Sequence, residues 1–317
     1  MPVNVIRFNH EGTSRWGVVH AGMITPIEGR FDTTADFLKA VDIDALAALE
    51  GGQIAESSVT WLSPITRNQQ FVCQGANYRQ HMIESGVDPD TKSYNMIFTK
   101  ATSCVCAADS PVIRPQGVKF LDYEIELGIV LRKDITTKIE VTKDTLHEYV
   151  GGIVIVNDYS ARDVQIPQMQ FYKGKSFRSF GPVGPYLCLL ERSAMDALVA
   201  LDLTLTVNGE VRQQDNTRNL VYSPAETLTE LSGVQDLFVG DLLATGTPSG
   251  CALSIPSPAK QKIGALLPEK KKWDIFMKVQ AKRTQYLKPG DIVESRISCE
   301  QMNIDLGTQR NQVIEAS

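Results

Sequence analysis

Histidine, closely paired cysteines and long apolar stretches are all scarce in this 317-residue chain. It has four histidines, and none of its six cysteines stands in a C-x-x-C spacing. Zinc centres usually combine several such ligands, so we expect no zinc site and reduced, packed thiols. Apolar runs such as Ile153 to Val156 are far too short to span a bilayer, and the N-terminus carries no signal-peptide pattern. A cytoplasmic protein is therefore expected.

The chain also lacks an excess of basic charge. Its 32 Lys and Arg residues face 37 Asp and Glu residues, which gives a net charge of −5 at pH 7. Nucleic acids and anionic membranes attract basic surfaces, so neither is expected as a partner. The hydrophobic content of 43% is that of a globular protein with a sizeable core. The length predicts one large domain accompanied by a small one.

Hydrophobic patterning divides the chain into two regions. Residues 1–66 combine strand patterns with two short helical patterns, which predicts a small N-terminal α/β module. Residues 67–317 are rich in strands, and one alternating stretch turns at Asn208-Gly209, a strong hairpin signal. We predict an α+β protein with predominantly mixed β structure. A Lys-rich segment at about 256–287 is predicted to be an insertion, either a solvated helix or a lid or dimer arm.

The sequence FLDYEIELGIVL at 120–131 has the composition of a buried strand, yet it carries an acid at every second position. Asp122, Glu124 and Glu126 would share one face of such a strand. An exposed acidic face is one explanation, but the apolar neighbours argue against it. Buried carboxylates repel one another, and a hard cation such as Mg²⁺, Mn²⁺ or Ca²⁺ would hold them together. Asp158, at the end of another apolar strand, is the candidate third ligand.

Further residues with catalytic chemistry stand outside this strand. His81 and Glu84 are three positions apart, which makes them neighbours on a helix. A carboxylate beside an imidazole raises its basicity, although such pairs are also common on protein surfaces. Other candidates lie in polar or turn-rich segments: Arg162, Gln165, Lys175 and Thr247.

Taken in order, these segments resemble the fumarylacetoacetate hydrolase (FAH) family. The motifs are GANYRQHMIE, IFTK, FLDYEIELGIV, GGIVIVNDYSARDVQ, GKSFRSFGPVGPYL, VNGEVRQQDNT, SPAETLTELS and GDLLATGTPSG. The resemblance runs from Phe71 to about Gly250 and resumes at LKPGDIVESRI. It implies a small N-terminal domain followed in the chain by an FAH-type coiled β-roll catalytic domain. Members of this family are commonly homodimers.

The resemblance also implies the role of each position. It implies a divalent metal, usually Mg²⁺, with the ligands Glu124, Glu126 and Asp158. The residues that match a water-activating dyad are His81 and Glu84, and the residue that matches a lysine stabilising negative charge is Lys175. The positions that match substrate-binding residues are Tyr78, Arg162, Gln165 and Thr247.

These features together predict a metal-dependent enzyme that acts on a small oxo acid or diketone. The first hypothesis is hydrolysis of a C–C bond in a 1,3-diketone or diketo acid, such as an acylpyruvate or a fumarylacetoacetate-like compound of aromatic catabolism. The alternative is an oxaloacetate-type decarboxylase or a 2-oxo-dienoate isomerase or hydratase, because a metal-bound enolate serves all of these reactions. A non-catalytic binding protein is disfavoured by the intact set of acid, base and lysine positions. Arg178 replaces the aspartate common in the family, so the substrate stays open.

Overall fold

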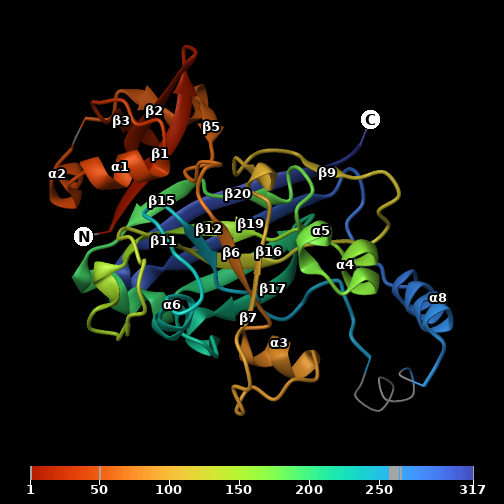
Figure 1. The fold of residues 1–317 in the computed structure, drawn as a ribbon. Coiled ribbons are helices and arrows are strands. Elements are labelled where there is room, and N and C mark those ends of the chain that lie inside the picture. Colours follow the sequence, from red (N-terminus) through yellow and green to blue (C-terminus); the bar gives the residue numbers. More distant parts are fainter. Residues whose placement is uncertain (1, 50, 257–263, 265, 317) are drawn as a thin grey trace.

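The structure, a computed structural model, describes residues 2–49, 51–256, 264 and 266–316. Two large β-sheets form its centre, and short helices lie around them (Figure 1). Both sheets contain antiparallel and parallel pairs. This arrangement confirms the predicted α+β class with predominantly mixed β structure. Within the described part of the chain, no helix is long and apolar enough to cross a membrane.

The larger sheet has eleven strands in the order β4-β3-β2-β1-β15-β12-β11-β18-β6-β7, and β5 pairs with β1. Strands β18 and β6 run parallel, and the other pairs are antiparallel. Its strands are β1 Val3–His10, β2 Thr13–His20, β3 Met23–Pro26, β4 Ile54–Ala55, β5 Thr60–Leu62, β6 Phe71–Gly75, β7 Met96–Thr99, β11 Ile125–Leu131, β12 Val150–Asn157, β15 Tyr186–Leu189 and β18 Leu242–Ala244.

The second sheet has the order β17-β16-β19-β20-β9 and packs against β11 and β12 of the first. Its hairpin turns at Asn208 and Gly209, whose φ angles of 52° and 81° suit the predicted tight turn. Its strands are β9 Val112–Arg114, β16 Asp202–Val207, β17 Glu210–Asn216, β19 Ile292–Cys299 and β20 Ile304–Glu315. Two smaller pairs join β10 Leu121–Asp122 to β13 Ser160–Ala161 and β8 Val105–Cys106 to β14 Gly181–Pro182.

The helices are short and carry several of the predicted site residues. The α6 helix begins with a capping box, in which Ser223 and Glu226 exchange hydrogen bonds with each other's backbone. The helices are α1 Thr34–Ala40, α2 Ile43–Ala47, α3 Arg79–Glu84, α4 Arg162–Gln168, α5 Phe171–Lys175, α6 Pro224–Leu231 and α8 Glu269–Gln280.

The N-terminal region is joined to the rest of the chain through the larger sheet. In Figure 1 its red and orange elements form a lobe at the upper left. The first half of β1 nevertheless pairs with β15, from Val3 opposite Leu189 to Ile6 opposite Tyr186. The second half pairs with β2 and β5. The sheet therefore continues across the boundary predicted near Arg67, and the division into two domains stays a prediction.

Candidate active site

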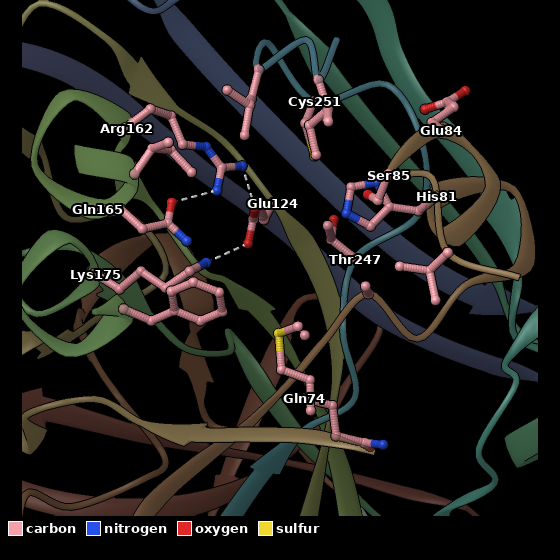
Figure 2. Close-up of a pocket in the computed structure, with 18 of the residues that line it drawn as sticks. Gln74, His81, Glu84, Ser85, Glu124, Arg162, Gln165, Lys175, Thr247 and Cys251 are labelled. Carbon is pink, nitrogen blue, oxygen red and sulfur yellow. Dashed lines mark hydrogen bonds and ion pairs between the residues drawn. The ribbon is translucent and has the colours of Figure 1, made fainter. Parts of the chain in front are cut away.

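A cavity of about 620 Å³ opens beside the ends of β6 and β11. Its walls come from segments that are distant in the sequence: α3, the start of α4, the end of α5 and the loop after β18. Figure 2 shows Arg162, Gln165 and Lys175 gathered around Glu124, with the His81 ring on the opposite side. Most of the residues singled out in the sequence line this cavity, namely His81, Glu84, Glu124, Glu126, Arg162, Gln165, Lys175 and Thr247.

The acidic stretch forms two strands rather than one. β10 ends at Asp122 and β11 begins at Ile125, so the predicted continuous strand is interrupted at Tyr123 and Glu124. The Asn157 side chain accepts a hydrogen bond from the Glu124 amide at 2.9 Å, which ties the interruption to the end of β12. All positions of β11 are buried, so its carboxylate does not face solvent. The explanation of an exposed acidic face is therefore wrong.

Three buried carboxylates converge as the sequence predicted. Glu124, Glu126 and Asp158 each present an oxygen, and these oxygens all lie within 4.8 Å of one another. The backbone fixes two of them together, because the Asp158 amide donates to the Glu124 carbonyl at 2.9 Å. A set of three carboxylates is the donor set that hard divalent cations prefer.

Arg162 binds this cluster through Glu124. Its Nε donates to Asp122 at 2.8 Å, one terminal nitrogen pairs with Glu124, and the other donates to the Gln165 amide oxygen at 2.8 Å (Figure 2). Asp122 also accepts the amides of the loop at Ala252 and Leu253, at 2.7 and 3.0 Å. Although burial opposes its ionisation, Arg162 and then Lys175 lower the pKa of Glu124 to about 2.

Two lysines complete the network, and one of them had no predicted role. Lys175 donates to Glu124 at 2.6 Å and to Asp158 at 2.5 Å. Lys100 pairs with the other oxygen of Asp158 and donates to the Phe180 carbonyl at 2.7 Å. The Lys100 side chain is fully buried and does not line the cavity. It ends the IFTK motif, and its apolar surroundings could have indicated a buried, paired lysine.

The buried carboxylates of the site outnumber its buried cationic groups. Four buried carboxylates (Asp122, Glu124, Glu126 and Asp158) face three buried cationic groups (Lys100, Arg162 and Lys175). Glu126 pairs with none of these cations in the described structure and accepts only the Gly246 amide, at 2.9 Å. Burial, with Asp158 and Glu124 adding repulsion, raises its pKa well above the usual range. The residues present therefore fit a divalent cation bound next to Glu126.

His81 and Glu84 both lie on α3, but they do not form a hydrogen-bonded pair in the described structure. The His81 ring faces the cavity, and the Glu84 carboxylate is directed away from it (Figure 2). Glu84 is exposed and accepts a hydrogen bond from Gln80 at 3.2 Å. Burial lowers the pKa of His81 from its ordinary value, Glu124 opposes this effect and Arg162 adds to it. The dyad thus stays a prediction that requires a rotation of the Glu84 side chain.

The predicted substrate-binding residues differ in whether they line the cavity. Gln165 and Thr247 line the cavity, and the Thr247 hydroxyl donates to the Ile125 carbonyl at 2.9 Å. Tyr78 is fully buried outside the lining, where a β-bridge to Leu220 fixes its backbone. Its hydroxyl has no hydrogen-bond partner among the described residues. A direct substrate contact by Tyr78 is therefore not supported by this arrangement.

The C-terminal end of the predicted insertion contributes a further cavity residue. Residues 257–263 and 265 lie outside the described residues, and α8 follows them (Figure 1). Arg283, which the sequence did not single out, lines the cavity and donates from Nε to the Ala252 carbonyl at 2.5 Å. Arg178, in contrast, is exposed and outside the lining.

Comparisons with known proteins show the family of the chain. The sequence model of the family described as Fumarylacetoacetate (FAA) hydrolase C-terminal matches residues 70–314. A 2,4-didehydro-3-deoxy-L-rhamnonate hydrolase from Sphingomonas sp. (strain SKA58) is 31% identical over 98% of this chain and 95% of its own. The oxaloacetate tautomerase YisK from Bacillus subtilis (strain 168) is 36% identical over 64% of this chain and 66% of its own.

A solved structure gives the same result for the fold. A fumarylacetoacetate hydrolase from psychrophilic Exiguobacterium antarcticum matches 99% of this chain and 100% of its own, with a TM-score of 0.72 and 28% identity. The family match covers far more than half of the sequence, and it includes each predicted metal, catalytic and substrate position. The chain is therefore a member of the fumarylacetoacetate hydrolase family.

Proposed function

We propose that this protein is a metal-dependent hydrolase that cleaves a C–C bond in a 1,3-diketone or diketo acid. The observation that carries the proposal is the buried triad Glu124, Glu126 and Asp158 beside Lys175, with His81 on the same cavity. Hydrolysis of a β-diketone needs ligands for a metal, a base that activates water and a positive charge that stabilises the enolate. The triad, His81 and Lys175 would supply these in turn. Mg²⁺ is the metal we propose, with Mn²⁺ and Ca²⁺ as substitutes, because the ligands are all carboxylates.

A bound divalent cation would polarise a chelated carbonyl oxygen and stabilise the negative charge of an enolate. The chain's own groups do the rest of the proposed reaction. An imidazole nitrogen of His81 accepts a proton from water, whose oxygen bonds to the carbonyl carbon as the C–C bond breaks. The electron pair of that bond is delocalised as the enolate, which is then protonated. The Lys175 ammonium group lies against two ligands and adds positive charge beside them.

The second candidate function is tautomerisation, isomerisation or decarboxylation of an oxo acid on the same site. One specific observation favours it: the Glu84 carboxylate makes no hydrogen bond to His81 in the described structure, so the base for activating water is not oriented by its partner. A relative 36% identical to this chain carries the name oxaloacetate tautomerase. Proton transfer to and from an enolate requires one acid or base and no activated water.

A substrate panel with a metal control separates these functions. Acylpyruvates, oxaloacetate and linear or cyclic diketones would be incubated with the protein in Mg²⁺ or in EDTA, and products followed by NMR. We expect C–C cleavage of a diketo acid in Mg²⁺ and none in EDTA. Glu126→Gln should lose Mg²⁺ binding in calorimetry, whereas Glu84→Gln should bind Mg²⁺ normally. Full activity in excess chelator would contradict the metal assignment, and keto-enol exchange without cleavage would favour the second function.

We also propose that the protein is a cytoplasmic homodimer that acts on small molecules. The family resemblance supports this proposal, and the negative charge of the chain is consistent with small-molecule substrates rather than nucleic acid. Light scattering coupled to gel filtration would measure the mass in solution, and a monomer mass near 35.0 kDa would contradict the dimer.

A further inference from the structure

Three cationic side chains line the cavity, and two of them are already engaged. Arg162 is hydrogen-bonded by three of its nitrogens to Asp122, Glu124 and Gln165. Lys175 is paired with Glu124 and Asp158. Arg283 is the third. Among the described residues it has no carboxylate partner, and only its Nε is used, in the bond to a backbone carbonyl.

The position of Arg283 is fixed by well-packed neighbours. Gln280, which is almost fully buried, donates to the Ser254 carbonyl at 2.9 Å and accepts from the Tyr286 hydroxyl at 2.7 Å. The Tyr286 ring packs on Phe120, with ring centroids 4.9 Å apart. These contacts precede and follow Arg283 by three residues each, so they hold both sides of its backbone against the cavity wall. A guanidinium held in this way binds with less loss of side-chain entropy than a free one.

We propose that Arg283 forms an anion subsite that binds a second carboxylate of the substrate, and that the preferred substrates are therefore 2-oxo or diketo acids with two carboxylates. The inference rests on the proposed function for the placement of the first oxo-acid group at the metal triad. A guanidinium presents paired N–H donors that match a carboxylate, and the terminal nitrogens of Arg283 are available for this contact.

The surrounding charges support this assignment. The acidic residues that line the cavity are Glu84, which is exposed, and the two proposed ligands Glu124 and Glu126. Glu124 is neutralised by Arg162 and Lys175. Arg178, which replaces the aspartate common in the family, lies outside the cavity lining, whereas Arg283 lines it.

Binding of matched ligands tests the subsite without relying on turnover. The Kd values of 2-oxoadipate and 2-oxohexanoate, which share a chain length and differ by one carboxylate, would be measured by calorimetry in Mg²⁺. The wild-type protein should prefer 2-oxoadipate. Arg283→Met should weaken 2-oxoadipate binding about tenfold to a hundredfold, as loss of a charge-assisted hydrogen bond predicts, and change 2-oxohexanoate binding less than twofold. Arg283→Lys should retain part of the preference.

Arg178→Met is the matched control, because it removes the same charge from an exposed position outside the cavity lining. Equal weakening of both ligands in Arg283→Met, or no diacid preference in the wild type, would overturn the subsite. Thermal unfolding of each variant shows whether it is folded. If no diketo acid is cleaved but the preference depends on Arg283, the proposed hydrolysis fails and the subsite stands. If diketo monoacids are cleaved and the preference is absent, the subsite fails and the hydrolysis stands.

Discussion

Lys100 is a buried cation that does not touch the cavity, yet it pairs with one oxygen of Asp158, which is a proposed metal ligand. A lysine in such a place positions the ligand and compensates its charge. Because the pair is removed from water, the loss of Lys100 leaves one oxygen of buried Asp158 without its cation and only Lys175 paired with the other, which is more damaging than the loss of an exposed pair.

Replacing Lys100 with methionine should therefore lower the free energy of unfolding by about 3–5 kcal/mol, the range for one partner of a buried ion pair. Mg²⁺ should restore part of this loss, because a bound cation would pair with Asp158 in its place. Thermal unfolding with and without Mg²⁺ measures both effects. Lys143→Met, which breaks an exposed pair with Asp196, serves as the control and should barely change the unfolding temperature. An equal Mg²⁺ effect in the wild type and in Lys100→Met would contradict the compensation.

The His81 side chain gives a prediction about pH. Burial lowers its pKa below the ordinary value of about 6.5, so the neutral, basic form should persist into mildly acidic solution. The turnover number of the wild type should hold constant at neutral pH and fall only as the pH drops through this lowered pKa. His81→Ala should lose that acidic limb and lower turnover by about 10²–10⁴, the usual share of general base catalysis.

The matched control is His20→Ala, which removes an exposed histidine of the N-terminal region. It should leave the pH profile unchanged. Calorimetry should give the same Mg²⁺ affinity for His81→Ala as for the wild type, since His81 is not a proposed ligand. An unchanged acidic limb in His81→Ala would assign that limb to another group and favour the second function.

Among single residues, the sequence was most informative where a backbone pattern fixed the side chain. The two-residue spacing placed Glu124 and Glu126 together, although Glu124 lies just before β11 rather than within it, and the end of a neighbouring apolar strand placed Asp158 beside them. It was least informative about rotamers and distant packing. Three-residue spacing put His81 and Glu84 on one helix but could not orient Glu84. Tyr78 stands next to the same helix, and its backbone forms a β-bridge to Leu220, far along the chain.

At the scale of elements, the hairpin at Asn208-Gly209 and the capping box of α6 follow from local chemistry, and the hairpin was predicted from the sequence. The interruption between β10 and β11 was not predicted. It depends on Asn157 and on the loop amides at Ala252 and Leu253, all more than thirty residues away in the chain from the acids that they contact. Short-range patterns carry no information about such contacts.

The predicted insertion at about 256–287 is the segment whose removal is most informative. Its described part packs on the site through Gln280, Arg283 and Tyr286, so two replacements by a Gly-Ser linker would have different effects. Replacing 256–279 should leave KM for a diacid nearly unchanged if α8 is only a surface helix. Replacing 256–287 should raise it at least tenfold, because Arg283 and its supports are lost.

Mg²⁺ affinity should be unchanged in both deletion variants, since the proposed ligands lie on other elements. Steady-state kinetics and calorimetry provide the two measurements, and gel filtration reports any change in oligomeric state. The same KM in both variants and in the wild type would mean that the whole segment is a passive surface elaboration.

The fold class of the whole molecule could be predicted because strand patterns dominate the sequence and the family motifs occur in order. The joining of the N-terminal region to the larger sheet could not. Its first strand reads as the start of a separate module, but Val3, Val5 and Trp16 belong to the same buried core as residues of β11 and β12. Pairing between strands that are about 180 residues apart leaves no local signature in the sequence.

The pairing of β1 with β15 has a consequence for solubility. Without residues 1–66, β15 would become the edge of the larger sheet, with unpaired N–H and C=O groups from Tyr186 to Leu189. Open, apolar edges act as templates for pairing between molecules. We expect a protein that begins at Arg67 to aggregate as its concentration rises, which dynamic light scattering would detect, even though every predicted metal ligand is retained. A monodisperse truncated protein would contradict this. The N-terminal region would thus protect the edge of β15 from pairing with strands of other molecules.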